Sequence, residues 1–199
     1  MALAGGIIAM FAVLAVVGAY MVLRPVGQMT VKIGANDAKA MATAVGADGI
    51  AEQNNGVYVG VVLYFDEVRL KDASTGQWTT IKAPGQMDIV VLANKSGGSV
   101  LVQATIPQGT YDEIVLVINR VTVTVEVSWG GYNKKWDVDA QVNNHELHLL
   151  GPITVDANGV IVLITFSITR SVKHDVNWGS GQVTGATFAP SATLSVVEG

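Results

Sequence analysis

The sequence predicts a mainly β protein, in which one apolar N-terminal helix is followed by a single antiparallel β-sandwich. Two observations carry this prediction. Residues 2–23 contain no charged side chain, which is typical of a helix that is buried on every face. The remaining chain consists of short β-branched runs separated by Gly, Pro, Asn and Asp about every 8–12 residues, as in all-β sandwiches. We therefore divide the 199 residues into a helix over 1–26 and a β-domain over 27–199.

Composition excludes nucleic-acid binding and every site that needs cysteine. The net charge is −4 with acids and bases dispersed, so there is no basic stripe of the kind that binds nucleic acid. Charged residues make up only 14 %, well below the roughly 25 % of an average soluble domain. The chain has no cysteine, which excludes disulfides, thiolate metal sites and a lipid-modified cysteine.

The N-terminal run is long enough to cross a bilayer. Its 22 residues would form a helix of about 33 Å, close to the thickness of the hydrocarbon core. Arg24 and Pro25 follow it directly and are expected to end the helix. Three interpretations are open: a cleaved signal peptide, a plain membrane anchor, or the tail of a filament subunit.

The signal peptide is the weakest of the three, because a basic first region is absent and the apolar run is too long. The run instead resembles the mature tail of type IV pilins and archaellins, particularly the archaeal kind, which lacks the acidic residue of bacterial pilins. In such filaments the tails pack into a central bundle, and the small residues of this run permit close approach. The large side chains expected to make the polymer contacts are Leu3, Ile7, Ile8, Met10, Phe11, Leu14, Val17, Tyr20 and Met21.

Strands are expected wherever apolar and polar residues alternate between turn signals. The predicted strands cover residues 28–34, 57–70, 77–82, 87–93, 100–105, 111–119, 121–127, 134–139, 146–150, 153–155, 160–170 and 192–197. A short helix is predicted over 38–45, after Asn36 and Asp37 as N-cap candidates. Asp66 and Glu67 interrupt the alternation of residues 57–70 and suggest a β-bulge. Residues 174–185 are predicted to form a polar loop.

The β-domain resembles domain-of-unknown-function family 4382. The carrying segments are GQMTVKIGANDA, FDEVRLKDASTGQWTTI, DIVVLANKSGGSVLVQATIPQGTYDEIVLVINRVTV and ELHLLGPITVDANGVIVLITFSITRSV. Its central P-x-G-x-Y-x-x-I-x-L step is matched by Pro107, Gly109, Tyr111, Ile114 and Leu116. The resemblance covers most of 27–198 and implies an immunoglobulin-like or transthyretin-like sandwich outside the cell. It supplies no activity and no catalytic residues. Many members carry a lipidated cysteine that this chain lacks, and residues 46–55 are an additional loop.

No catalytic, cofactor or metal site is predicted. His145 and His148 are spaced i, i+3, which in a strand sends them to opposite faces, so they are not expected to share a metal ion. His174 lies in a predicted loop, and no sequence motif places a serine for a hydrolase triad with it. Three acidic pairs, at 66/67, 112/113 and 137/139, are expected to be solvated, with Ca²⁺ binding as the alternative. Trp78, Trp129, Trp136, Trp178 and Tyr132 are expected in the core or in subunit contacts, with a sugar-binding shelf as the alternative.

The sequence therefore favours a structural subunit of an extracellular type IV pilus-like or archaellum-like filament, not an enzyme. Its partners would be further copies of itself and, before assembly, the membrane; a glycan is expected at the sequon beginning with Asn94. One alternative is a membrane-anchored surface binding module. The other is donor-strand assembly, in which residues 28–34 complete the sheet of a neighbouring subunit.

Overall fold

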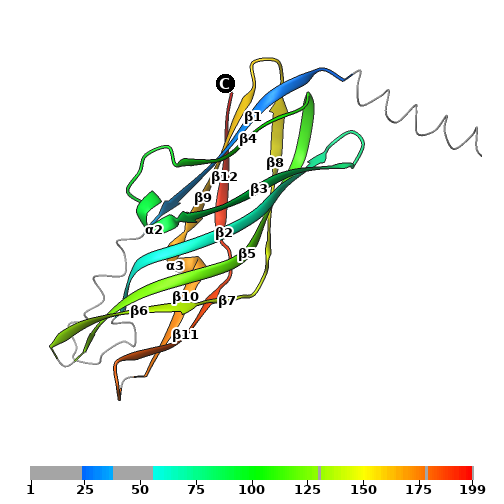
Figure 1. Ribbon diagram of the computed structural model, residues 1–199. Coiled ribbons are helices and arrows are strands. Elements are labelled where there is room, and N and C mark those ends of the chain that lie inside the picture. The colour runs from blue at the N-terminus through cyan, green and yellow to red at the C-terminus, as the bar shows by residue number, and fades with distance from the viewer. Residues whose placement is uncertain (1–23, 38–55, 130, 178, 199) are drawn as a thin grey trace, which may run out of the picture.

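The computed structural model describes residues 24–37, 56–129, 131–177 and 179–198 (Figure 1). Within these residues the chain forms strands joined by tight turns and two single-turn helices, α2 (Ile89–Leu92) and α3 (Ile168–Ser171). The strands are β1 (Val26–Asn36), β2 (Gly56–Asp72), β3 (Trp78–Asp88), β4 (Ser99–Pro107), β5 (Gly109–Trp129), β6 (Tyr132–Asp139), β7 (Gln141–Val142), β8 (Glu146–Val155), β9 (Val160–Ser167), β10 (Val172–Asn177), β11 (Gln182–Phe188) and β12 (Ala192–Glu198).

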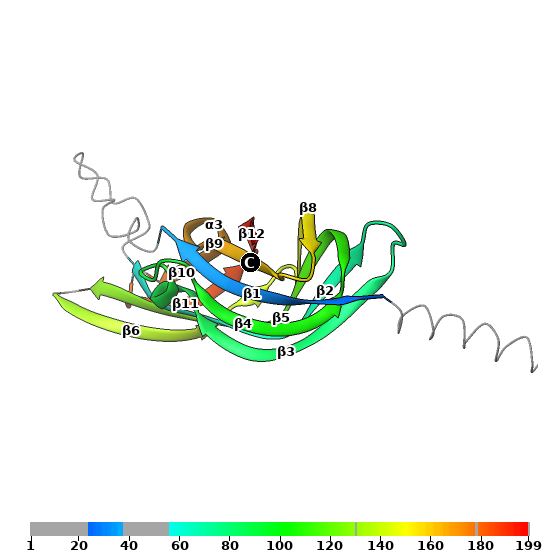
Figure 2. The same cartoon turned by 90° about the horizontal axis from the view of Figure 1, so that it is seen from above.

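The strands form three sheets. Sheet A has the order β12-β9-β1-β4, and sheet C has the order β10-β11-β7. Sheet B has the order β3-β2-β5-β6, and β8 also pairs with β5. β5 is long because its first half pairs with β8 and its second half with β6, so it supports two neighbours in succession. Figure 2 shows β9 and β12 in one layer and β3 and β5 in the other.

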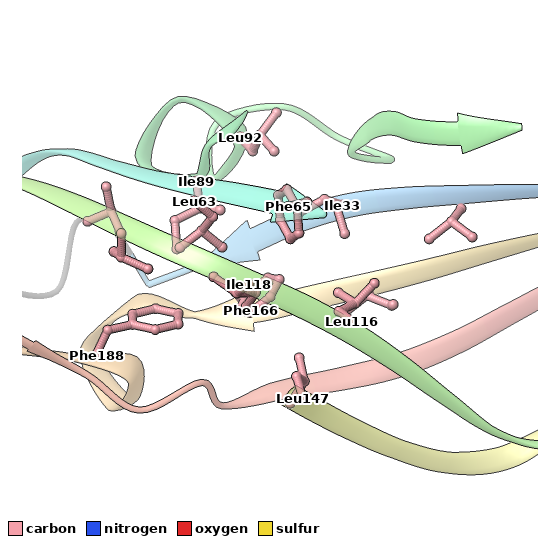
Figure 3. Close-up of a cluster of buried hydrophobic side chains, with 14 of the residues drawn as sticks. Ile33, Leu63, Phe65, Ile89, Leu92, Leu116, Ile118, Leu147, Phe166 and Phe188 are labelled. Atoms are coloured by element: carbon pink, nitrogen blue, oxygen red, sulfur yellow. The ribbon is translucent and has the colours of Figure 1, made fainter. Parts of the chain in front are cut away.

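One hydrophobic core lies between the layers. Strict alternation places Met29, Val31 and Ile33 of β1 inside with no exposed surface, and β9 does the same with its alternate residues. Figure 3 shows how Phe166 from β9 and Phe188 from β11 lie among side chains of β2 and β5. Burying each large apolar side chain contributes about 1.5–3 kcal/mol, so this core is the main source of stability.

β1 occupies the interior of sheet A. It pairs antiparallel with β4 and parallel with β9, so both of its edges are hydrogen-bonded within its own chain. The parallel pairing brings the first described strand beside one from the last quarter of the sequence, and β1 thus closes the sandwich.

The predicted fold class is wrong as stated, although its mainly β character holds. The predicted antiparallel sandwich is in fact mixed, because β1 pairs parallel with β9, and β7 with β11. The two helices found in the described residues have four residues each, and none there is long and apolar enough to cross a membrane. The long helix predicted over residues 2–23 and the short one over 38–45 lie outside the described residues.

Three local predictions also need correction. Residues 83–86, predicted to separate the strands 77–82 and 87–93, lie inside β3. An edge strand tolerates Pro84 there because its outer N–H groups have no ladder partner. Residues 89–92 are helical, because the Asp88 carboxylate accepts a hydrogen bond from the Val90 amide at 2.9 Å and caps the turn. The predicted loop over 174–185 contains much of β10 and β11. The predicted bulge is confirmed by the register shift between Phe65 and Glu67.

Candidate functional site

The structure places the junction with the N-terminal segment at one end of the β-domain, where β1 and β5 begin and β2 ends (Figure 1). The segment itself lies outside the described residues. The same holds for its predicted polymer contacts, which are Leu3, Ile7, Ile8, Met10, Phe11, Leu14, Val17, Tyr20 and Met21. The first described residue at the junction is Arg24.

Arg24 is fastened to the domain by an ion pair. Its guanidinium donates to the carboxylate of Asp72, at the end of β2, across 48 residues of sequence. The Asp72 side chain is only 5 % exposed and that of Arg24 is 25 % exposed. The two charges are thus largely removed from water, so loss of either partner is expected to destabilise the junction.

The turn after β2 holds the Asp72 carboxylate in place. Asp72 Oδ1 accepts from the Ser74 amide at 2.9 Å, the Ser74 hydroxyl at 2.6 Å and the Thr75 amide at 3.0 Å. Burial alone raises the pKa of Asp72, but the hydrogen bonds from Ser74, Arg24 and the two amides outweigh it and hold the pKa far below its usual range. Asp72 therefore stays ionised and available to Arg24 in mild acid.

Hydrogen bonds to backbone carbonyls hold the chain directly after Arg24. The Gln108 amide donates to the Pro25 carbonyl at 2.7 Å, and the Gln108 side chain donates to the Val26 carbonyl at 3.0 Å. Gly27 is buried against the turn after β8, where a Cβ atom would lie 2.1 Å from the Asp156 carbonyl oxygen. Residues 24–27 are therefore held against the domain, and within the described residues no flexible linker separates Arg24 from β1.

The first residues of the central family motif, Pro107, Gly109 and Tyr111, lie at this junction. A side chain at Gly109 would collide with the Arg24 guanidinium, because its Cβ atom would lie 2.0 Å from Nη2. The hydroxyl of the fully buried Tyr111 donates to the Pro107 carbonyl at 2.7 Å and pins the start of β5 to the end of β4. Ile114 and Leu116 continue into the core. Gly109 of the motif thus leaves room for the Arg24 guanidinium at the start of β5.

The outer face of sheet B carries a second polar cluster. Arg69 donates to Glu67 at 2.5 Å and to Glu146 on β8 at 2.8 Å, and Lys82 on β3 donates to Glu67 at 2.5 Å. Beneath them Val115 is only 1 % exposed. Hydrogen bonds from Lys82 and Arg69 lower the pKa of Glu67. Beside this cluster a surface hollow is lined by Asp66, Glu67, Arg69, Lys82, Pro84 and Val117.

The histidines take separate roles. His148 contacts Glu113 at 2.6 Å and Glu146 at 3.3 Å, and the hydrogen bond with Glu113 raises the pKa of His148. His145 is bonded to the Ile118 carbonyl at 2.8 Å. His174 Nδ1 lies 2.8 Å from the hydroxyl of the buried Tyr58, and burial lowers the pKa of His174. The described part of the chain brings no three metal-ligating side chains together.

The acidic pairs and aromatic residues do not converge on one site. Glu67 and Glu113 are paired with cations, and Asp137 and Asp139 accept from threonine hydroxyls at 2.6 and 2.9 Å. Trp78 lies at the start of β3, near the junction, whereas Trp136 packs half-buried against the core from β6. The side chain of Trp129 and the whole of Trp178 lie outside the described residues.

Asn94 lies in the turn after α2. Both Asn94 and Ser96 of the sequon are exposed, and the Asn94 side chain makes only a long hydrogen bond of 3.5 Å to the Val90 carbonyl. The amide that an oligosaccharide would occupy is thus accessible. Glycosylation stays a prediction.

The Asp37 carboxylate predicts how the free energy of unfolding depends on pH. Asp37 caps α3 by accepting from Ser167, Ile168 and Thr169; burial raises the pKa of Asp37, but these hydrogen bonds prevail and lower it. An aspartate with a depressed folded pKa stabilises the fold above the unfolded value of about 3.9 and loses that contribution below it. We therefore expect the free energy of unfolding, measured by urea titration, to fall steeply as pH drops below about 4. The Asp37→Asn variant should show a shallower fall; an identical pH profile would contradict the assignment.

The sequence analysis missed Asp72 and its partner. The run Asp72-Ala-Ser-Thr-Gly76 does signal a turn in which an aspartate accepts from nearby amides. Nothing in the run shows that the carboxylate also receives Arg24, because the contact depends on how β1 and β2 are arranged in space. The glycine of the central motif was the one available signal of a close approach.

Comparison with known proteins identifies the family of the chain. The model of the family described as a domain of unknown function, DUF4382, matches residues 49–184, about two thirds of the chain. The match includes Asp72 and the whole motif from Pro107 to Leu116, but it begins after Arg24 and β1 and ends before β12. No curated protein and no solved structure matches the chain. The chain therefore belongs to the DUF4382 family.

Proposed function

We propose that the protein is a structural subunit of an extracellular filament that resembles the type IV pili or archaella of archaea. It would polymerise through the apolar segment at residues 2–23 and display the β-domain on the outside. The segment would reside in the membrane before assembly. The partner would be further copies of the same chain, and no cofactor or nucleic acid is required.

The junction is the observation that carries this proposal. A charge-free run of 22 residues passes without a linker into a sheet, and the first residue after it is locked by a buried ion pair. A filament needs this arrangement, because regular packing of the segments can order the outer domains only if each domain is held at a fixed angle. Burial of the segments supplies the driving force, at about 25 cal/mol per Å² before the costs of association.

The alternatives are less well supported by the geometry. A binding module on a membrane anchor does not need a rigid junction. Its proposed sugar-binding surface would also need the tryptophans side by side, whereas Trp78 lies on β3 and Trp136 on β6, in different parts of sheet B. Donor-strand assembly requires a sheet that lacks a strand. Here β1 is hydrogen-bonded on both edges within its own chain, so the domain is already complete.

A charge in the segment tests the proposal. Replacing Ala12 or Gly18 with arginine should abolish filaments, because a guanidinium would have to be buried in the apolar bundle without a partner. The β-domain should remain folded, which protease resistance of the full chain in detergent checks. Electron microscopy of material sheared from producing cells gives the readout.

The matched control is Ala12→Ser, which is small and uncharged and should leave filaments intact. Normal filaments from either arginine variant would overturn the proposal. If Ala12→Ser also lost filaments, position 12 would tolerate no substitution, and the Gly18→Arg variant would decide.

A further inference from the structure

A row of four side chains crosses the outer face of sheet B beside the junction. In order across the sheet they are Trp78 on β3, Lys71 on β2, Glu113 on β5 and Leu150 on β8, which are direct cross-strand partners. We call these four residues the junction row. Trp78 is 45 % exposed and Leu150 is 77 % exposed. Only a few large apolar side chains of the described residues are this exposed. Two of them lie at the ends of one row, which points to contact with another molecule.

The position of the row relative to Arg24 identifies that partner. Lys71 immediately precedes Asp72, so the row lies one strand step, about 3.3 Å, from the residue that holds Arg24. The Asp72 amide also donates to the Gln77 carbonyl at 2.9 Å, one residue before Trp78. The apolar segment ends at residue 23, and there is no linker. A bilayer that takes up the segment must therefore reach the level of Trp78.

The chemistry of the row suits a lipid–water interface. Tryptophan is enriched there because its ring is apolar while its N–H is polar, and lysine extends its ammonium toward water. Lys71 Nζ lies 6.0 Å from the centre of the Trp78 ring and 4.0 Å from Glu113 Oε2. Glu113 is in turn bonded to His148. The charges are thus paired, and partial removal of the row from water costs less than it would for isolated ions.

We propose that the junction row rests in the lipid–water interface while the segment is in the membrane, with Trp78 and Leu150 inserted among the headgroups. This inference rests on the membrane-inserted state of the proposed function. It adds that the domain touches the membrane through this row, at the junction end of the outer face of sheet B, instead of standing clear of it. Acidic side chains near the junction include Asp112 and Asp156, so contact with apolar lipid, not attraction to anionic headgroups, is the basis of the interaction.

Site-specific labelling tests the proposal, since the chain has no cysteine and each introduced one is unique. The full chain would carry a bimane label at Leu150→Cys, or at Tyr132→Cys as the control. Tyr132 is 75 % exposed, like Leu150, but lies at the β5–β6 hairpin, at the other end of the domain. A third label at Ala19→Cys reports whether the segment is in lipid. Each protein is reconstituted into phosphatidylcholine vesicles with and without a doxyl-lipid quencher.

We expect strong quenching at positions 19 and 150, and several-fold weaker quenching at position 132. Quenching at 19 but not at 150 would overturn the inference and leave the proposed function intact. A blue-shifted label at 150 without lipid quenching would also overturn it, and would identify a second copy as the occupant. Absence of quenching at 19 would show that the segment is not in lipid, which contradicts the proposed function itself. Equal quenching at 132 and 150 would indicate general adsorption and reject the row as the contact.

Discussion

Replacing Asp72 with alanine is expected to lower the free energy of unfolding of the β-domain by about 3 kcal/mol, the cost of breaking a buried ion pair from one side. The variant loses the acceptor of three hydrogen bonds within the turn and the carboxylate to which the Arg24 guanidinium donates. Urea unfolding of the full chain in detergent, followed by circular dichroism, measures the change.

Asp156→Ala is the matched control for this prediction. Asp156 also caps its own turn, accepting from the amides of Asn158 at 2.8 Å and Gly159 at 3.1 Å, but its side chain is exposed and forms no ion pair with another described residue. Its loss should cost about 1 kcal/mol, as for an ordinary hydrogen-bonded cap. Equal effects of the two variants would mean that the ion pair with Arg24 contributes nothing to the fixing of the junction.

A second large effect is expected in β1. Val31→Asp would place a carboxylate at a position with no exposed surface, between β4 and β9, and should cost about 4 kcal/mol or more. Thr30→Asp lies one residue away on the same strand, with its side chain on the opposite face, and should change the free energy of unfolding by less than about 1 kcal/mol.

This pair of variants decides whether β1 is part of its own domain. If Val31→Asp unfolds the β-domain and Thr30→Asp does not, the strand is built into the core of the chain that carries it. If both variants are as stable as the unaltered protein, β1 is not part of the core. Donor-strand exchange between subunits would then return as the better account of assembly.

The sequence was a good guide to strands and a poor guide to how they pair. Alternation located β1, β2, β4, β9 and β12 because one face of each packs against the core, and a two-residue period is readable without knowing the partner. It did not reveal that residues 111–119 and 121–127 form one continuous strand, since the change of face near Asn119 and Arg120 looks like a turn. Nor did it reveal the parallel pairing of β1 with β9, which depends on contacts across more than 130 residues.

The candidate site was predictable only in part. The end of the apolar run at Arg24 and Pro25 is plain from hydropathy, and the glycine of the central motif hints at a close approach. The recognition of Arg24 by Asp72 is a tertiary contact that neither local pattern contains. The junction row was likewise hidden, because Trp78 and Leu150 reach the same row only through the register of four strands.

The most direct test of the account is to shear surface material from cells that produce the protein, image it by electron microscopy and measure the intact mass of the subunit. The account predicts filaments built from a chain that retains residues 2–23, with additional mass if Asn94 carries a glycan. Filaments whose subunits lack that segment, or the absence of filaments with the intact chain confined to the membrane fraction, would contradict it.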